Sequence, residues 1–88
     1  MEFKHEPGRI FALGDDGTLL AEITFPANGG VAVVDHTFVH ESLRGQGVAG
    51  KLMEEAVADI RQAGLKLKPV CSYAVGWMEK HPEHQDLL

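Results

Sequence analysis

The sequence predicts an α+β fold of mixed α/β character, in which an antiparallel meander of strands precedes a central helix, a further strand and a short C-terminal helix. Apolar residues with a period of two fill much of the first half of the 88-residue chain. A single later segment repeats its apolar residues every three or four positions, which indicates an amphipathic helix. Strands followed by a helix and another strand favour a layered α+β domain.

Two turn sequences divide the first half of the chain into three expected strands. Residues 9–13 form a short apolar strand that ends at the sequence GDDG, where Gly17 can take a positive φ angle. Residues 18–25 alternate as a half-buried strand should, and the second hairpin turn is expected at Asn28 and Gly29.

Residues 31–39 are rich in β-branched side chains and are expected to form one central strand. If the alternation is unbroken, one face of that strand carries Ala32, Val34, His36 and Phe38. The expected helix begins at Val48 and is capped at its C-terminal end by Gly64. Its predicted buried positions are Val48, Leu52, Met53, Ala56, Val57 and Ile60.

An extended segment is expected at residues 65–73, followed by a short helix at residues 74–80 that stops before Pro82. A chain of this length is expected to form one domain, residues 1–88, with room for a single site.

Bulk properties restrict the partners and the compartment. Thirteen acidic residues against eight basic ones give a net charge of −5, which argues against a nucleic-acid footprint. No apolar run is long enough to span a bilayer, so no membrane partner is expected. The N-terminal residues lack a signal-peptide pattern and Cys71 is the only cysteine, so a reducing cytoplasm is expected. His36 and His40 are too far apart along a strand to share an ion, and no metal is expected.

Residues 44–50, with the sequence RGQGVAG, join the expected strand to the expected helix. The first amides of a helix have no partners within it and attract anions, and glycines allow close approach, so a diphosphate would fit here. The alternative is a tight turn with no ligand. A P-loop is excluded because Leu52, not Ser or Thr, follows Lys51, and a dinucleotide fold would need a strand directly before the first glycine.

The sequence VHESLRGQGVAGKLM resembles the acyl-coenzyme A motif of the GNAT acyltransferase superfamily, R/Q-x-x-G-x-G/A, with Arg44, Gly47 and Ala49 at its fixed positions. Over residues 9–88 the chain is similar to a small GNAT-like family of short N-acetyltransferase domains. Three short sequences carry this similarity. They are HT at residues 36–37, before the glycines, and CSY at residues 71–73 and HPE at residues 81–83, both after the expected helix.

This resemblance implies a minimal GNAT-like N-acetyltransferase domain with acetyl-coenzyme A as donor and an unidentified amine as acceptor. The expected cofactor-binding residues are Phe38, Val39, Arg44, Gly45, Gln46, Gly47, Val48, Ala49 and Gly50. In the superfamily a tyrosine of the last helix often protonates the leaving thiolate, and here Met78 occupies that position. A monomer or weak homodimer is expected.

Cys71 and His36 are the expected catalytic residues. Cys71 could protonate the leaving thiolate or carry the acetyl group itself, with His36 as the histidine that would activate it or take a proton from the acceptor. Each could instead be a core residue. Ser72, Tyr73 and His81 are secondary candidates. The competing interpretations are a non-enzymatic acyl-coenzyme A-binding sensor or regulatory module, and an unrelated binder of phosphate or nucleoside diphosphate.

Overall fold

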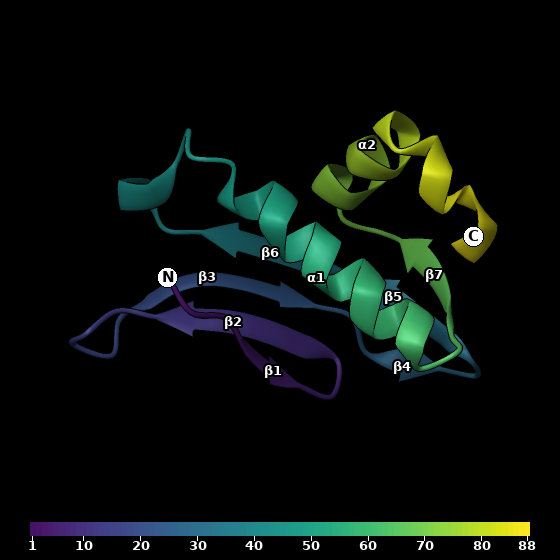
Figure 1. Cartoon of the computed structure of the whole chain (residues 1–88), viewed down its shortest axis with the longest axis horizontal. Helices are drawn as coiled ribbons and strands as arrows, with labels where there is room; N and C mark the ends of the chain where they lie inside the picture. The colour runs from purple at the N-terminus through teal and green to yellow at the C-terminus, as the bar shows by residue number, and fades with distance from the viewer.

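The computed structural model describes residues 1–88 and has the predicted α+β class, with two sheets and two α-helices (Figure 1). One sheet, with strand order β1-β2-β3-β6, is antiparallel throughout and consists of Lys4–Glu6, Arg9–Leu13, Leu19–Thr24 and His36–Val39. The other has the order β4-β5-β7 and consists of Ala27–Asn28, Val31–Val34 and Lys66–Pro69. The helices are α1 (Val48–Gln62) and α2 (Ser72–Lys80), and the 3-10 segments are η1 (Glu41–Leu43) and η2 (Pro82–Leu87).

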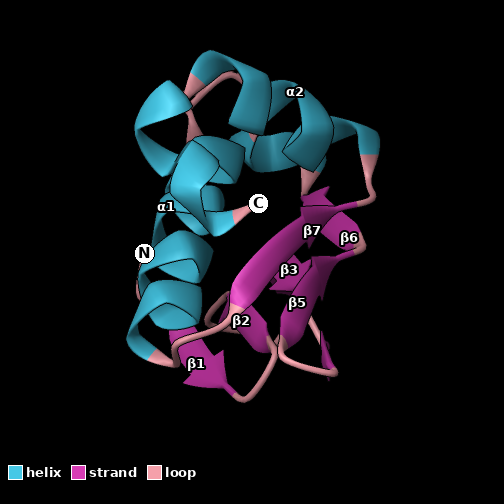
Figure 2. Cartoon of the chain, turned by 90° about the vertical axis from the view of Figure 1, so that its right-hand side faces the viewer, coloured by secondary structure: helices cyan, strands magenta, loops and turns pink.

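Helix α1 crosses one face of the sheets and connects β6 to β7, so that β5 and β7 pair in parallel (Figures 1 and 2). All six apolar positions predicted for its inner face are buried. They pack against strand residues such as Ile10, Ala21 and Ile23 in one core of 17 buried residues. The other face of the antiparallel sheet carries no helix (Figure 2).

The predicted single strand over residues 31–39 is wrong, because the chain changes sheets at Asp35. Strand β5 pairs with β4 and β7, whereas β6 pairs with β3. Val34 is fully buried. Three residues later, Thr37 lies opposite the buried Ile23 in the pairing of β6 with β3. The alternation therefore shifts by one residue at Asp35, as in a β-bulge, and turns His36 away from the core.

One further prediction is corrected at a turn, and one strand was missed. The second hairpin turn lies at Gly29 and Gly30, with φ angles of 60° and 84°, because Asn28 still pairs with Val31. Two adjacent positive φ angles fit the turns that match strand twist. Strand β1 was not predicted, since its three residues are polar and exposed at the sheet edge.

The segment after α1 also differs from the prediction. Strand β7 ends at Pro69, and α2 begins at Ser72 instead of residue 74. The predicted ends of the helices are confirmed: Gly64 has a φ of 73° after α1, and α2 stops before Pro82. Neither helix is long and apolar enough to cross a bilayer.

Candidate functional site

The glycine turn, residues 44–50, leads from η1 into the first turn of α1. Gly45 has a φ of 83°, and Gly47, the residue before the helix, has a φ of 73° and a ψ of 18°. L-residues with side chains rarely adopt these left-handed conformations. The glycines are therefore required by the path of the backbone itself.

Most amides of the glycine turn find no acceptor within the protein. That of Arg44 bonds to the Glu41 carbonyl at 3.3 Å, and the next bonded amide is that of Lys51, which donates to the Gly47 carbonyl at 3.2 Å. The six amides of residues 45–50 precede it, no side chain caps the helix, and its first turn contains no acidic residue. Six unpaired N–H groups at the positive end of a helix form a strong potential anion site.

A shallow pocket of about 260 Å³ lies over this turn. Residues of the turn line it together with Val39, Leu43 and Tyr73. A methyl group added to Gly50 would lie 3.6 Å from the Tyr73 hydroxyl, so this hydroxyl sits beside the turn. Partial burial raises the pKa of Tyr73, which keeps its hydroxyl protonated and able to donate a hydrogen bond at neutral pH.

Strand β6 has an open edge that begins at the pocket. The amides of Val70 and Cys71 both bond to the carbonyl of Val34, at 2.9 and 3.1 Å, and beyond this point β6 has no partner on the side away from β3. The His40 amide donates to the carbonyl of Leu20, a residue of β3, at 2.7 Å. Hydrogen-bonding directions alternate along an antiparallel strand, so the main chains of Val39 and Thr37 face the open edge.

This alternation refines the expected contact residues. The main chain of Phe38 faces β3, so the polar groups available to a ligand come from Val39, as predicted, and from Thr37, which was not among the predicted residues. Strands β6 and β7 splay apart, because β7 pairs with β5 and not with β6.

Cys71 lies at the closed end of the splay, where β7 has ended. It is the N-cap of α2, not a strand residue as predicted, and its Sγ accepts a hydrogen bond from the Ala74 amide at 3.4 Å. The same sulfur is 3.9 Å from Oγ1 of Thr37. The thiol is partly buried against the core, on the helix-bearing side of the sheet.

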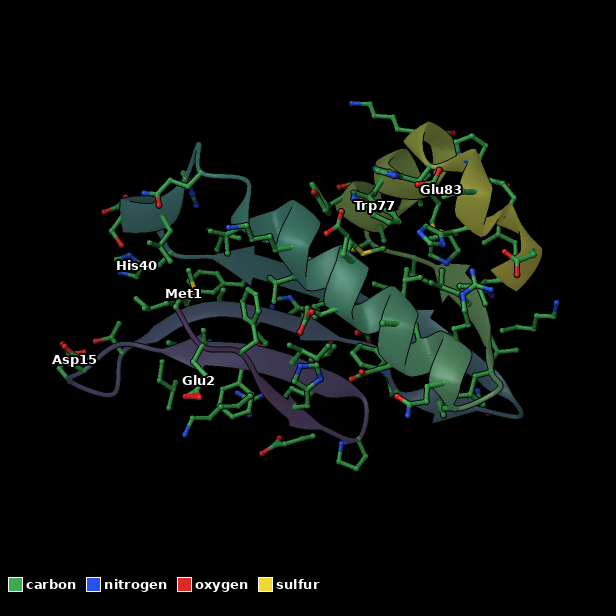
Figure 3. All side chains as sticks on the ribbon, in the orientation of Figure 1. Met1, Glu2, Asp15, His40, Trp77 and Glu83 are labelled. Carbon is green, nitrogen blue, oxygen red and sulfur yellow. The ribbon has the colours of Figure 1, made fainter.

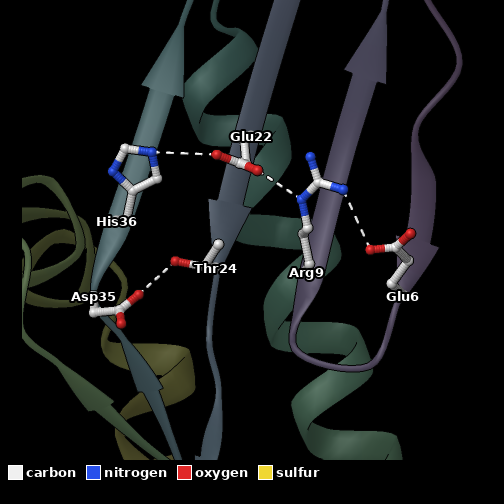
Figure 4. A network of polar contacts seen from close by, with 6 residues as sticks. All are labelled: Glu6, Arg9, Glu22, Thr24, Asp35 and His36. Atoms are coloured by element: carbon white, nitrogen blue, oxygen red, sulfur yellow. Dashed lines mark hydrogen bonds and ion pairs between the residues drawn. The ribbon is translucent and has the colours of Figure 1, made fainter. Parts of the chain in front are cut away.

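His36 does not meet Cys71, so the predicted cysteine–histidine contact is not formed. The imidazole lies on the open face of the sheet, where Nε2 is 3.3 Å from Oε1 of Glu22 (Figure 4). Arg9 donates from Nε to the other oxygen of Glu22 at 2.6 Å. Thr37 and Cys71 occupy the opposite side of β6, because successive side chains of a strand point to opposite faces.

Neither of the remaining candidates, Ser72 and His81, lines the pocket over the glycine turn. Ser72 is exposed in the first turn of α2 and makes no side-chain hydrogen bond. The ring of His81 stacks on Trp77, with 3.8 Å between centroids, and its Nδ1 is 2.9 Å from Oε2 of Glu83. Figure 3 shows Trp77 and Glu83 together in the C-terminal helical layer. In the structure His81 packs and orders this layer.

Sequence reasoning missed Glu22 and Thr37 as site residues. Glu22 was visible only as a polar residue on the outer side of an amphipathic strand, and its contact with His36 depends on the register between β3 and β6. Thr37 was assigned to the wrong face by the unbroken alternation. Neither signal could be interpreted before the break at Asp35 was known.

The α+β fold with its splayed sheet is the fold of the GNAT superfamily. The chain belongs to the GCN5-related N-acetyltransferase family, and the match to this family covers residues 10–87. Comparison with curated protein sequences gave no significant match.

Solved structures agree with this assignment. A GCN5-like protein from Staphylococcus aureus, determined by NMR, is 34% identical, with a TM-score of 0.80 over 98% of this chain and 85% of that one. Tetrahymena GCN5 is 17% identical, with a TM-score of 0.66 over 82% of this chain and 48% of its own. The ribosomal-protein-S18-alanine N-acetyltransferase of Escherichia coli is 16% identical, with a TM-score of 0.66 over 82% and 49%. The chain thus spans about half of these two larger structures, which show the shared fold.

Proposed function

We propose that this protein binds acetyl-coenzyme A and transfers the acetyl group to an amine. One observation carries the proposal: six unpaired amides lie at one end of the open edge of β6, and a partly buried thiol lies at the other. The geometry suits a ligand with a diphosphate at one end and a thioester at the other.

In this arrangement the amides of the glycine turn hold the pyrophosphate, and the exposed guanidinium of Arg44 adds charge-assisted hydrogen bonds. The pantetheine arm, which carries two amides, lies along the open edge and pairs with the main chains of Val39 and Thr37 as an added strand would. Tyr73 closes the side of the pocket next to Gly50.

The thioester then reaches the closed end of the splay, near Thr37 and Cys71. The nitrogen lone pair of the acceptor, as a neutral amine, attacks the carbonyl carbon, the C–N bond forms, and the C–S electrons leave with the sulfur. The nitrogen loses one proton as the amide forms, and this proton restores the thiol of Cys71 after Cys71 has protonated the leaving sulfur. Cys71 is the nearest thiol that can give that sulfur a proton. Met78 is buried and has no proton to donate, so it cannot replace the tyrosine of other superfamily members.

The rival function is a non-enzymatic sensor of acyl-coenzyme A, and it predicts the same binding. Isothermal titration with acetyl-coenzyme A tests the shared step. A free-thiol release assay over a panel of primary amines, including lysine peptides, then separates the two. Binding with amine-dependent thiol release supports the transferase; binding without release on any amine supports the sensor; absence of binding contradicts both and favours a different phosphate ligand.

A further inference from the structure

We propose that Glu22 is a positioning residue that aligns His36 as the proton acceptor for the incoming amine. The inference rests on the proposed transferase function and adds a residue to it. It starts from the polar network on the open face of the sheet (Figure 4).

Both oxygens of the Glu22 carboxylate have defined partners. Oε2 accepts from Nε of Arg9 at 2.6 Å, and Oε1 is 3.3 Å from Nε2 of His36. The Glu22 side chain is only 16% exposed. Arg9 is itself held, because its guanidinium lies 3.8 Å from the centre of the Phe11 ring and also contacts Glu6. Glu22 is thereby fixed from the β2 side and presents its second oxygen to His36.

This contact selects one form of the neutral imidazole. A carboxylate oxygen 3.3 Å from Nε2 favours the form with the hydrogen on Nε2, because a lone pair at Nε2 would face the negative charge of Glu22. Nδ1 then carries the lone pair. Figure 4 shows Nδ1 on the side of the ring away from Glu22, toward the open edge of β6. The side chain of His36 is 52% exposed, so a proton taken up there can pass to water.

The break at Asp35 places this base on the face opposite Cys71. The Thr24 hydroxyl donates to the Asp35 carboxylate and holds the break in place (Figure 4). An acceptor that arrives on the open face as an ammonium would give one proton to Nδ1 of His36, and its freed lone pair would attack the thioester. The charged groups around His36 are Glu22 and the neighbouring Asp35, with Arg9 behind Glu22. Proton removal and thiolate protonation then occur from opposite sides of the sheet.

The test compares the full-length protein with Glu22→Gln, His36→Gln and the double variant. Two-bond ¹H–¹⁵N spectra of neutral His36 should show the Nε2–H form in the wild type and a mixture in Glu22→Gln, since an amide can either donate or accept. With the best amine of the panel, kcat should fall at least tenfold in Glu22→Gln, and the Kd for acetyl-coenzyme A should change less than twofold. If Glu22 acts through His36, the double variant will be no slower than His36→Gln alone.

Glu55→Gln is the matched control, since it makes the same change of charge beside a different histidine: Glu55 lies on α1 and contacts His5 of β1. It should leave kcat unchanged. Wild-type kcat in Glu22→Gln, an unchanged imidazole form, or additive losses in the double variant would overturn the proposal. A wild type that binds acetyl-coenzyme A but acetylates no amine would instead contradict the proposed function, and this would be seen before any variant is compared.

Discussion

The sulfur of Cys71 lies 3.9 Å from the hydroxyl of Thr37, and the ring of His36, one residue earlier, lies on the other face of the same strand. The two candidate catalytic groups therefore flank the open edge of β6 instead of touching. A thiol–imidazole pair is excluded by this geometry, and the proposed mechanism therefore gives the two groups separate roles.

Replacement of Cys71 separates its capping role from its chemistry. Cys71→Ala removes the acceptor of the Ala74 amide and should lower the free energy of unfolding by about 1 kcal/mol. Cys71→Ser keeps a capping atom and should retain most of the stability, yet both variants should lose roughly a hundredfold in kcat if the thiol takes part in proton or acetyl transfer. Urea unfolding, thiol release and mass spectrometry for an acetyl adduct measure these effects. Normal turnover in both variants would remove Cys71 from the mechanism.

The glycine turn can be tested with a pair of alanine substitutions. Gly47 and Gly64 both have a φ of 73°, and a methyl group at either position meets no protein atom within 4 Å. Gly47→Ala and Gly64→Ala should therefore lose similar stability, about 1 kcal/mol. Only Gly47→Ala places its methyl group in front of the unpaired amides, so it alone should weaken acetyl-coenzyme A binding, by roughly tenfold or more.

Equal affinities for acetyl-coenzyme A in these two alanine variants would contradict a ligand site at the turn. Isothermal titration gives the affinities, and thermal unfolding shows that the backbone strain is matched. The comparison is informative because Gly64 lies at the far end of α1.

Periodicity predicted those parts of the fold in which local pattern and tertiary structure agree. The inner face of α1 and its glycine end follow from spacing alone. The change of sheets at Asp35 does not, because β-branched residues continue through it and the break depends on pairing with β3 and β7. Strand β1 has no apolar signal, since it is an exposed edge.

The same division holds at the site. The unpaired amides could be expected from glycine spacing and the start of a helix, because both are local properties. The separation of Cys71 from His36 could not, since a shift of one residue reverses every later side chain of a strand. The Glu22 contact follows from the register of two strands that are separated in the sequence by the β4–β5 hairpin.

Arg44 should contribute charge to ligand binding and little to stability. It is exposed and forms no ion pair, so Arg44→Gln should leave the melting temperature nearly unchanged. Loss of a charge-assisted hydrogen bond costs about 1.5–3 kcal/mol, or roughly ten- to a hundredfold in Kd. The control is Lys4→Gln, which makes the same charge change on exposed β1. Titrations at two salt concentrations should show a weaker salt dependence only for Arg44→Gln, and equal effects of the two variants would argue against a phosphate contact.

His5 should make the attachment of β1 to α1 dependent on pH. Its Nδ1 is 2.7 Å from Oδ2 of Asp59 and its Nε2 is 3.0 Å from Oε1 of Glu55. The hydrogen bond to Asp59 is the largest effect and raises the pKa of His5 above its usual 6.5. Burial opposes it, and the hydrogen bond to Glu55 adds a smaller rise. A raised folded-state pKa means that the ionic contribution is fully present below pH 6.5 and is lost as the pH rises through the folded-state value. His5→Gln should therefore destabilise the protein at pH 6 and much less at pH 9, as measured by urea unfolding. A difference from wild type that is the same at both pH values would show that the contact stabilises β1 without the charge.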